Sequence, residues 1–306
     1  MTETIEIPRR ISIVGATGTG KTALSIKLAL QDRRFELFSC DSMAVYRHMD
    51  LGTAKPRPEE LGDLNYCLIN LVEPTEEFSM AQFQNFAQEA EAKVAPGSFV
   101  LYVGGSGLYH KAVFDRLTVP PTDWLVRRQI ERELVEMGSQ GLYGRLVELD
   151  PLAAEKIEPT NSRRLVRALE VIEITNAPFS SFGQGITQYP RESGLLFGLE
   201  IDAKLLETAI AVRVDLLHQL GWVDECRALL EMGPLSRTAS YAIGYREIFS
   251  YLNREISLDE AIAQTIGRTR KFARRQKSWF GRDGRVKWFV DPNALADALL
   301  AVTDLP

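Results

Sequence analysis

The chain is poor in the residues that hold metals and disulfides, with three cysteines and three histidines among 306 residues. Cys40, Cys67 and Cys226 are odd in number and widely spaced, and no histidine lies at ligand spacing beside them, which argues against a disulfide framework or a zinc site. No apolar run approaches the roughly 18 residues of a membrane span. Residues 2–10 lack the apolar segment of a signal peptide. We therefore expect a cytoplasmic protein with no membrane partner.

Length, composition and charge limit which folds and partners are possible for this chain. With 45% hydrophobic residues, the chain can bury the core of one large α/β domain with an insertion, or of two domains. The net charge of −5 argues by itself against a nucleic-acid partner. The segment 268–288 is different, because it interleaves basic and aromatic side chains. Such a segment suits a phosphate backbone with stacked bases, although a solvated helix face gives the same charge pattern.

A glycine-rich turn carries the first specific motif. It follows the apolar strand candidate 11–14, opens the helical stretch 23–30 and fits G-x-x-x-x-G-K-[ST]. Its glycines let successive backbone N–H groups point at phosphate oxygens, Lys21 supplies a positive charge, and the Thr22 hydroxyl is placed to bind Mg2+. The predicted phosphate-binding residues are Gly15, Ala16, Thr17, Gly18, Thr19, Gly20, Lys21 and Thr22.

The ends of the other predicted strands indicate which kind of phosphate site this is. NTPases carry an acidic Mg2+ ligand at such a strand end, but the strand 99–103 is followed by Gly104, Gly105 and Ser106. An acid, Asp41, follows the strand 35–40 instead. Open parallel sheets bind ligands at the carboxyl ends of their strands, so we predict that Asp41 faces the glycine-rich turn.

Strand candidates alternate with helical patterns, which indicates a parallel sheet with right-handed crossovers. We predict an α/β fold of the P-loop NTPase type, with a catalytic core at 1–119 and 191–306 and an inserted helical lobe at 120–190. The predicted strands are 10–14, 35–40, 99–103 and 195–201, and the lobe helices are 123–137, a second segment through 149, and 162–175. After the fourth strand we expect only helices, at 204–220, 223–231, 240–252 and 259–280.

Longer segments are more specific than the glycine-rich turn. They are DSMAVYR (41–47), MDLGTAKP (49–56), GGSGLY (104–109), PTNSRRLVRALEV (159–171), AIGYR (242–246) and RKFARRQKSWF (270–280). In these segments the chain resembles the bacterial tRNA dimethylallyltransferases, also called tRNA isopentenyltransferases, over nearly its whole length. That family transfers a dimethylallyl group from dimethylallyl diphosphate to the N6 amine of the adenosine 3′ to the anticodon, position 37.

The resemblance implies a role for residues that match the family motifs. The glycine-rich turn, with Mg2+ on Thr22, would hold the diphosphate leaving group. Asp41 would be the general base for the exocyclic amine, Arg213 would pair with the diphosphate, and Ser106 would bind substrate through its hydroxyl. A surface arginine and a turn serine are the plain structural alternatives for Arg213 and Ser106.

The resemblance also implies a tRNA anticodon stem-loop as partner, bound by a monomer. The target base must be flipped out of its stack to reach Asp41, and the inserted lobe would hold the backbone. Arg164 and Arg167 lie three residues apart and therefore share a helix face, although either could be a solvated arginine. The residues that match tRNA-contacting positions are Asp41, Ser42, Met43, Ala44, Ser106, Arg127, Arg163, Arg164 and Arg167.

Three places depart from the family pattern. Residues 66–70 are YCLIN where the family usually has HHLID, Ala209 replaces an arginine, and Ala44 replaces a frequent glutamine. No reacting group is lost. An acid and an arginine are missing near the expected pocket, which bears on efficiency and acceptor choice.

Three other functions remain open at this level. The same prenyl transfer onto a free adenine nucleotide or another small acceptor would need neither the lobe nor the basic segment. A P-loop kinase using ATP would need the missing strand-end acid. A purely RNA-binding module would need neither the phosphate site nor Asp41.

Overall fold

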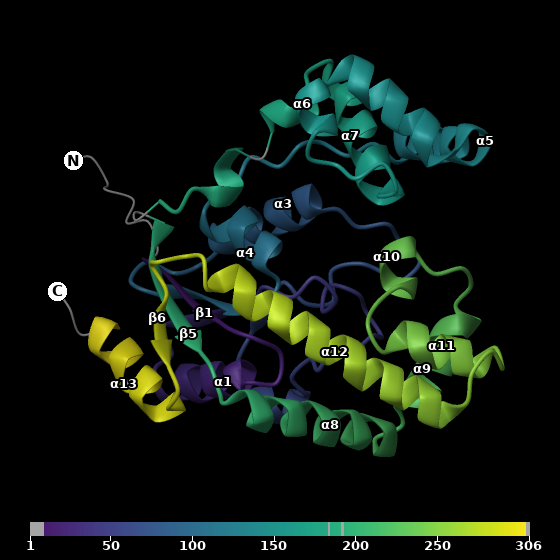
Figure 1. Ribbon diagram of the computed structural model, residues 1–306. Coiled ribbons are helices and arrows are strands. Elements are labelled where there is room, and N and C mark those ends of the chain that lie inside the picture. Colours follow the sequence, from purple (N-terminus) through teal and green to yellow (C-terminus); the bar gives the residue numbers. More distant parts are fainter. Residues whose placement is uncertain (1–8, 183, 191–192, 304–306) are drawn as a thin grey trace, which may run out of the picture. The chain divides into compact units, whose positions relative to one another are not determined.

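The computed structural model describes residues 9–182, 184–190 and 193–303 (Figure 1). Most of the segment examined above for a signal peptide lies outside these residues. The described residues of Met1–Phe78, Phe83–Asp115 and Tyr189–Pro306 form one compact unit, the core unit. Ser79–Gln82 and Arg116–Gln188 form a second, the helical unit. The helical unit covers most of the range 120–190 that was expected to be an inserted lobe.

The core unit is built on a six-stranded sheet in the order β3-β2-β4-β1-β5-β6. Every neighbouring pair of strands is parallel, so the predicted parallel α/β sheet is confirmed. The four predicted strands end within two residues of the observed ones. The strands are β1 (Arg9–Val14), β2 (Phe35–Ser39), β3 (Tyr66–Cys67), β4 (Phe99–Gly104), β5 (Leu195–Leu199) and β6 (Lys287–Phe289).

Helices pack on both faces of this sheet. On β4, Leu101 and Val103 belong to the apolar cluster shared with α1 and α13, whereas Val100 and Tyr102 belong to the cluster shared with α4, α9, α11 and α12. This alternation is that of a strand buried on both sides. The helices wholly or mainly in the core unit are α1 (Lys21–Gln31), α2 (Pro58–Leu61), α3 (Met80–Glu91), α4 (Gly107–Phe114), α8 (Ala203–Gln219), α9 (Trp222–Glu231), α10 (Arg237–Ser240), α11 (Tyr245–Leu252), α12 (Leu258–Phe280) and α13 (Pro292–Thr303).

Two expectations for the C-terminal region are wrong. Helices do not follow one another without interruption, because β6 pairs with β5, where the ring of Trp288 lies against Gly198 so closely that a Cβ atom would be 2.3 Å away. The helix expected at 240–252 begins only at Tyr245, as α11, and Ser240 instead ends α10. Gly244 separates them with φ 90° against the ring of Trp222. The capping box of α12, Ser257 with Glu260, is present as expected.

The helical unit contains α5 (Trp124–Leu149), α6 (Pro151–Ala154), α7 (Ser162–Thr175) and two short 3-10 turns, Phe179–Ser181 and Gln184–Thr187. Gly138, at φ 72°, divides α5 into two helical segments. The observed α7 coincides with the predicted helix.

A fully buried carboxylate organises the helical unit. Glu170, on α7, forms ion pairs with Arg127 of α5 at 2.6 Å and with Arg167 of its own helix at 2.7 Å. Arg167 also donates to the carbonyl oxygens of Pro120 and Pro121. These bonds satisfy a charge that would otherwise be buried alone.

His110 on α4 is buried beneath the sheet, with 2% of its surface exposed. Its Nε2 shares a hydrogen bond of 2.9 Å with Ser12 Oγ on β1, and its ring stacks on Phe114 at 4.8 Å. Burial lowers the pKa of His110 to about 4. Among the described helices, none is long and apolar enough to cross a membrane.

The buried histidine should make folding pH-dependent. In the unfolded chain His110 takes up a proton as the pH falls below about 6.5, whereas in the folded chain it resists until about 4. The folded state is therefore not penalised by His110 above pH 6.5. Between pH 6.5 and pH 4 the free energy of unfolding should fall by about 3 kcal/mol because of this residue. Urea unfolding at several pH values, for wild type and His110→Asn, measures this. An identical pH dependence in the two proteins would contradict it.

Candidate active site

The glycine-rich turn joins β1 to α1 at the carboxyl edge of the sheet. Gly15, at φ 148°, passes so close to β5 that a Cβ atom would lie 2.3 Å from the carbonyl oxygen of Leu199, which only glycine avoids. Gly20, the N-cap of α1, has φ 89°, and within the described chain no side chain caps this helix. The first N–H groups of α1 are thus available to an anion, which the helix dipole also favours.

Lys21 places a cation inside the turn, with 8% of its surface exposed. Its Nζ donates to the carbonyl oxygen of Ala16 at 2.6 Å and to Thr19 Oγ1 at 3.4 Å. Burial lowers the pKa of Lys21 to about 7; the charge of Asp41 opposes this shift, and that of Arg213 adds to it. Two basic groups and one carboxylate therefore share the site, an imbalance that a bound anion offsets.

Asp41 lies at the end of β2, at the same edge of the sheet. Its Oδ1 accepts the backbone N–H of Met43 at 2.8 Å and of Ala44 at 3.4 Å, a local turn that fixes the carboxylate. Its charge acts on both Lys21 and Arg213. A fixed, partly exposed carboxylate beside an anion site is able to accept a proton from a bound group.

Ser106, the N-cap of α4, ties the end of β4 to the end of β2. Its backbone N–H donates to the carbonyl oxygen of Cys40 at 3.2 Å, and its Oγ accepts the N–H of Ser42 at 3.2 Å. Gly104 makes this approach possible, since a Cβ atom there would lie 2.3 Å from the Cys40 oxygen. The structure therefore brings Ser106 together with the segment that begins at Asp41.

Arg213 reaches the turn from α8. Its Nη1 donates to Thr17 Oγ1 at 3.3 Å, and Leu206 and Ile210 of the same helix lie against Gly18. Burial lowers the pKa of Arg213, against the effect of Asp41. A planar guanidinium in this position is suited to a phosphate group.

The residues matched to tRNA-contacting positions have different surroundings. In the helical unit, Arg163 and Arg164 are exposed near the start of α7, whereas Arg127 and Arg167 are engaged by the buried carboxylate described above. In the core unit, Ala44 is 4% exposed and offers little side-chain surface. Helical spacing alone could not indicate that Arg164 is exposed whereas Arg167 pairs with the buried Glu170.

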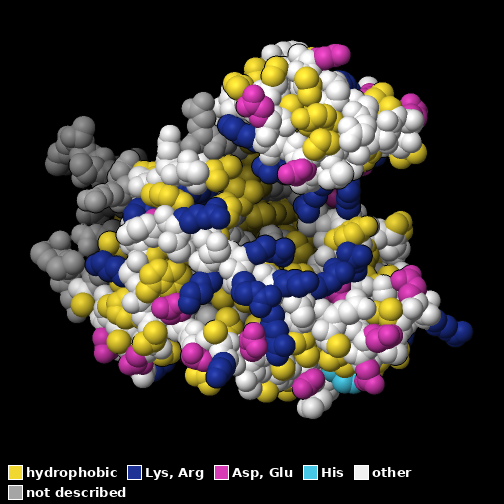
Figure 2. All heavy atoms as spheres, viewed as in Figure 1, with side chains coloured by type: hydrophobic (Ala, Val, Ile, Leu, Met, Phe, Trp, Pro, Cys, Tyr) yellow, Lys and Arg dark blue, Asp and Glu magenta, His cyan; other side chains and the backbone are white. Residues whose placement is uncertain are grey.

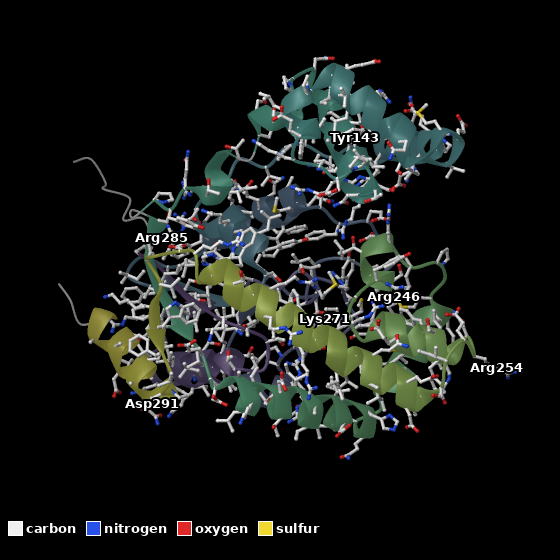
Figure 3. The ribbon with its side chains drawn as sticks, in the orientation of Figure 1. Tyr143, Arg246, Arg254, Lys271, Arg285 and Asp291 are labelled. Carbon is white, nitrogen blue, oxygen red and sulfur yellow. The ribbon has the colours of Figure 1, made fainter. Side chains whose placement is uncertain are left out.

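The basic segment forms much of α12, which crosses the face of the core unit seen in Figure 2, where Lys and Arg side chains gather. Not all its cations are free: Arg268 binds Glu247 at 3.0 Å, and Lys277 binds Glu200 at 2.9 Å. Arg285, after the helix, binds Asp115 and Asp283 (Figure 3). The exposed basic residues of α12 are Lys271, Arg274, Arg275 and Lys277.

Comparison with known proteins identifies the family. The model of the family described as IPP transferase matches residues 44–283. The chain belongs to the IPP transferase family. A tRNA dimethylallyltransferase of Streptomyces coelicolor is 43% identical over 305 residues, covering 98% of this chain and 97% of that protein. The solved tRNA isopentenylpyrophosphate transferase of Bacillus halodurans is 34% identical with a TM-score of 0.68, covering 97% of each chain. A eukaryotic dimethylallyltransferase shares the fold, with a TM-score of 0.78 at 24% identity.

One departure from the family pattern, Asn70, accepts a hydrogen bond from a buried lysine. Lys55, in the GTAKP segment, has a side chain that is 3% exposed. Its Nζ donates to Asn70 Oδ1 at 2.6 Å and to Asp50 Oδ1 at 2.7 Å. Asn70 therefore keeps the acceptor and Asp50 supplies the negative charge. Of the other two departures, Ala44 is buried, and Ala209 on α8 adds no cation one turn before Arg213.

The sequence analysis did not single out Gln276 on α12. Its Oε1 accepts the backbone N–H of Thr17 in the glycine-rich turn at 2.8 Å. Gln276 is 4% exposed and lies on the helix face of Ala273 and Phe280, which are also buried. An uncharged polar residue within an apolar helical stripe was the available signal.

Lys21→Ala and Arg213→Ala should each weaken binding of inorganic pyrophosphate by about tenfold or more, because each removes a charge-assisted contact from a partly buried site. Isothermal titration calorimetry in the presence of Mg2+ measures these pyrophosphate affinities. Lys27→Ala, an exposed lysine on α1, is the matched control and should change little. Affinities close to wild type in both test variants would exclude this edge of the sheet as the diphosphate site.

Proposed function

We propose that this chain is a Mg2+-dependent tRNA dimethylallyltransferase that modifies the N6 amine of the adenosine 3′ to the anticodon, position 37. The observation that carries the proposal is that the charge of Asp41 acts on both Lys21 and Arg213, beside the end of α1 that no side chain caps. Relatives named tRNA dimethylallyltransferase match nearly the full length of the chain, which supports the same acceptor here.

The proposed reaction replaces the C–O bond at the allylic carbon with a C–N bond. The N6 nitrogen attacks the first carbon of the dimethylallyl group, the C–O bond to the diphosphate breaks, and the diphosphate leaves with the electron pair. Asp41 hydrogen-bonds the amine and takes its proton. Lys21, Arg213 and the N–H groups of the turn stabilise the charge that grows on the leaving group, which is where positioned donors contribute most.

Thr22 is the proposed Mg2+ ligand, at the first turn of α1. In the described part of the chain, no cluster of three or more His, Cys, Asp or Glu side chains could hold a metal ion. Such a cluster is not required, because Mg2+ at phosphate sites keeps several waters and uses one or two protein oxygens with the phosphates themselves. When bound there, the ion would neutralise part of the diphosphate charge.

For the tRNA backbone we propose two basic surfaces, one on each unit. On the helical unit, Arg163 and Arg164 are exposed on α7. On the core unit, exposed lysines and arginines lie along α12, with Lys271 among them (Figure 3). Ser42, Met43 and Ser106 would lie next to the flipped base. One chain carries all these groups, so we propose a monomer, acting where its acceptor tRNA is found, in the cytoplasm.

One assay tests the function. Radiolabelled dimethylallyl diphosphate is offered to total tRNA, to an anticodon stem-loop with adenosine after the anticodon, and to AMP. Label should enter both RNAs and not AMP. Efficient labelling of AMP alone would favour the small-acceptor alternative, and phosphate transfer from ATP to any acceptor would contradict prenyl transfer.

Asp41→Asn should lower the single-turnover rate of transfer by about 100-fold or more, because the amide keeps the shape of the turn but cannot take a proton. Pyrophosphate binding should persist. Rapid-quench measurement at saturating substrates separates the chemical step from binding. A near-normal rate would remove Asp41 from the role of base.

Charge reversal separates the two groups of lobe arginines. Arg163→Glu with Arg164→Glu should raise the KM for tRNA by tenfold or more and flatten its dependence on salt, because fewer phosphates are neutralised. Arg254→Glu, an exposed arginine in the turn after α11 (Figure 3), is the control. Arg167→Glu should instead lower the melting temperature, since it leaves like charges beside Glu170. An unchanged KM for the double variant would contradict backbone binding by this surface.

A further inference from the structure

The two faces of α12 have different chemistry. Its exposed face carries Lys271, Arg274 and Arg275, whereas its inner face is mostly apolar. Two polar residues, Thr265 and Gln276, are buried on that inner face, and Thr265 Oγ1 donates to the carbonyl oxygen of Ala261 in its own helix. The buried carboxamide of Gln276 is costly unless it is hydrogen-bonded. Its bonding partner lies in the phosphate-binding turn and not in its own helix.

Thr17 is bonded from two sides. Its backbone N–H donates to Gln276 Oε1 at 2.8 Å, and its Oγ1 accepts Arg213 Nη1 at 3.3 Å. A single residue of the turn thus connects α12, on one side, with the guanidinium of α8, on the other. Removing the carboxamide would leave both the Thr17 N–H and the position of Arg213 less constrained.

Gln276 also lies against the turn after β4, which contains Gly105 and Ser106. A Cβ atom on Gly105 would be 2.2 Å from Gln276 Nε2 and 2.8 Å from the carbonyl oxygen of Gly15. The carboxamide is therefore packed between the turn after β1 and the turn that carries Ser106. Glycine-rich turns are conformationally permissive, so their N–H groups point in one direction only when their surroundings hold them.

We propose that Gln276 is a positioning residue for the diphosphate of the donor: it holds Thr17, and through Thr17 it holds Arg213, in the arrangement that binds the leaving group. This rests on the proposed function. The helix whose outer face is basic is thereby the same helix that holds the donor site in shape. In this role Gln276 itself touches neither the acceptor nor the reacting carbon.

Three variants test the proposal in the full-length protein. Gln276→Met keeps the volume and removes the acceptor, and Gln276→Asn keeps the carboxamide but withdraws it by one carbon. Gln264→Met, an exposed glutamine on the same helix, is the matched control. Inorganic pyrophosphate with Mg2+ is the probe, measured by calorimetry, and an anticodon stem-loop is the second probe, measured by fluorescence anisotropy.

Both Gln276 variants should weaken pyrophosphate binding about tenfold, with stem-loop affinity unchanged and the Gln264 control like wild type. In combination with Arg213→Ala, the effect of Gln276→Met should be much less than additive, because both act through Thr17. A general loss of structure would instead lower both affinities and combine additively.

Pyrophosphate affinities within twofold of wild type in the folded variants, or additive effects with Arg213→Ala, would overturn the role of Gln276 while leaving the proposed function intact. Wild-type protein that binds no pyrophosphate would overturn both.

Discussion

The structure depends on one electrostatic arrangement: the uncapped N-terminus of α1 with Lys21 buried inside the turn and Arg213 beside it. Two basic groups with a single carboxylate in a partly buried place are costly without an anion. Burial, with a smaller contribution from the charge of Arg213, lowers the pKa of Lys21 to about 7. The surroundings keep the arrangement in place. Gly15 lets the turn pass close to β5, and Thr17 is bonded by α8 and α12.

The parallel sheet determines which groups meet there. The carboxyl ends of β1, β2 and β4 share one edge, so the turn, Asp41 and Ser106 converge although they are distant in sequence. The acid follows β2 and not β4, where glycines allow the two strand ends to approach. In the proposed function, a carboxylate in that position acts on the acceptor amine, whereas an NTPase uses its strand-end acid to hold Mg2+. In the proposed function, the same phosphate-binding turn would hold a leaving group.

Local patterns predicted what local interactions determine. The turn, four of the six strands and α7 follow from short motifs, apolar runs and helical spacing, and in the structure the side chain of Asn161 caps α7. The strand β6 was missed because it has three residues and depends on Trp288 covering Gly198, a contact between distant segments. The pairing of Arg167 with Glu170 and of Gln276 with Thr17 is likewise decided by packing, so spacing along a helix could not indicate it.

A crystal structure of the protein with Mg2+ and dimethylallyl S-thiolodiphosphate, an analogue whose bond to the leaving group resists cleavage, would show directly where the diphosphate binds. We expect the diphosphate at the N-terminus of α1, in contact with Lys21 and Arg213, and the allylic carbon directed toward the side of Asp41. A diphosphate bound elsewhere on the core unit, or an allylic chain directed away from Asp41, would contradict it.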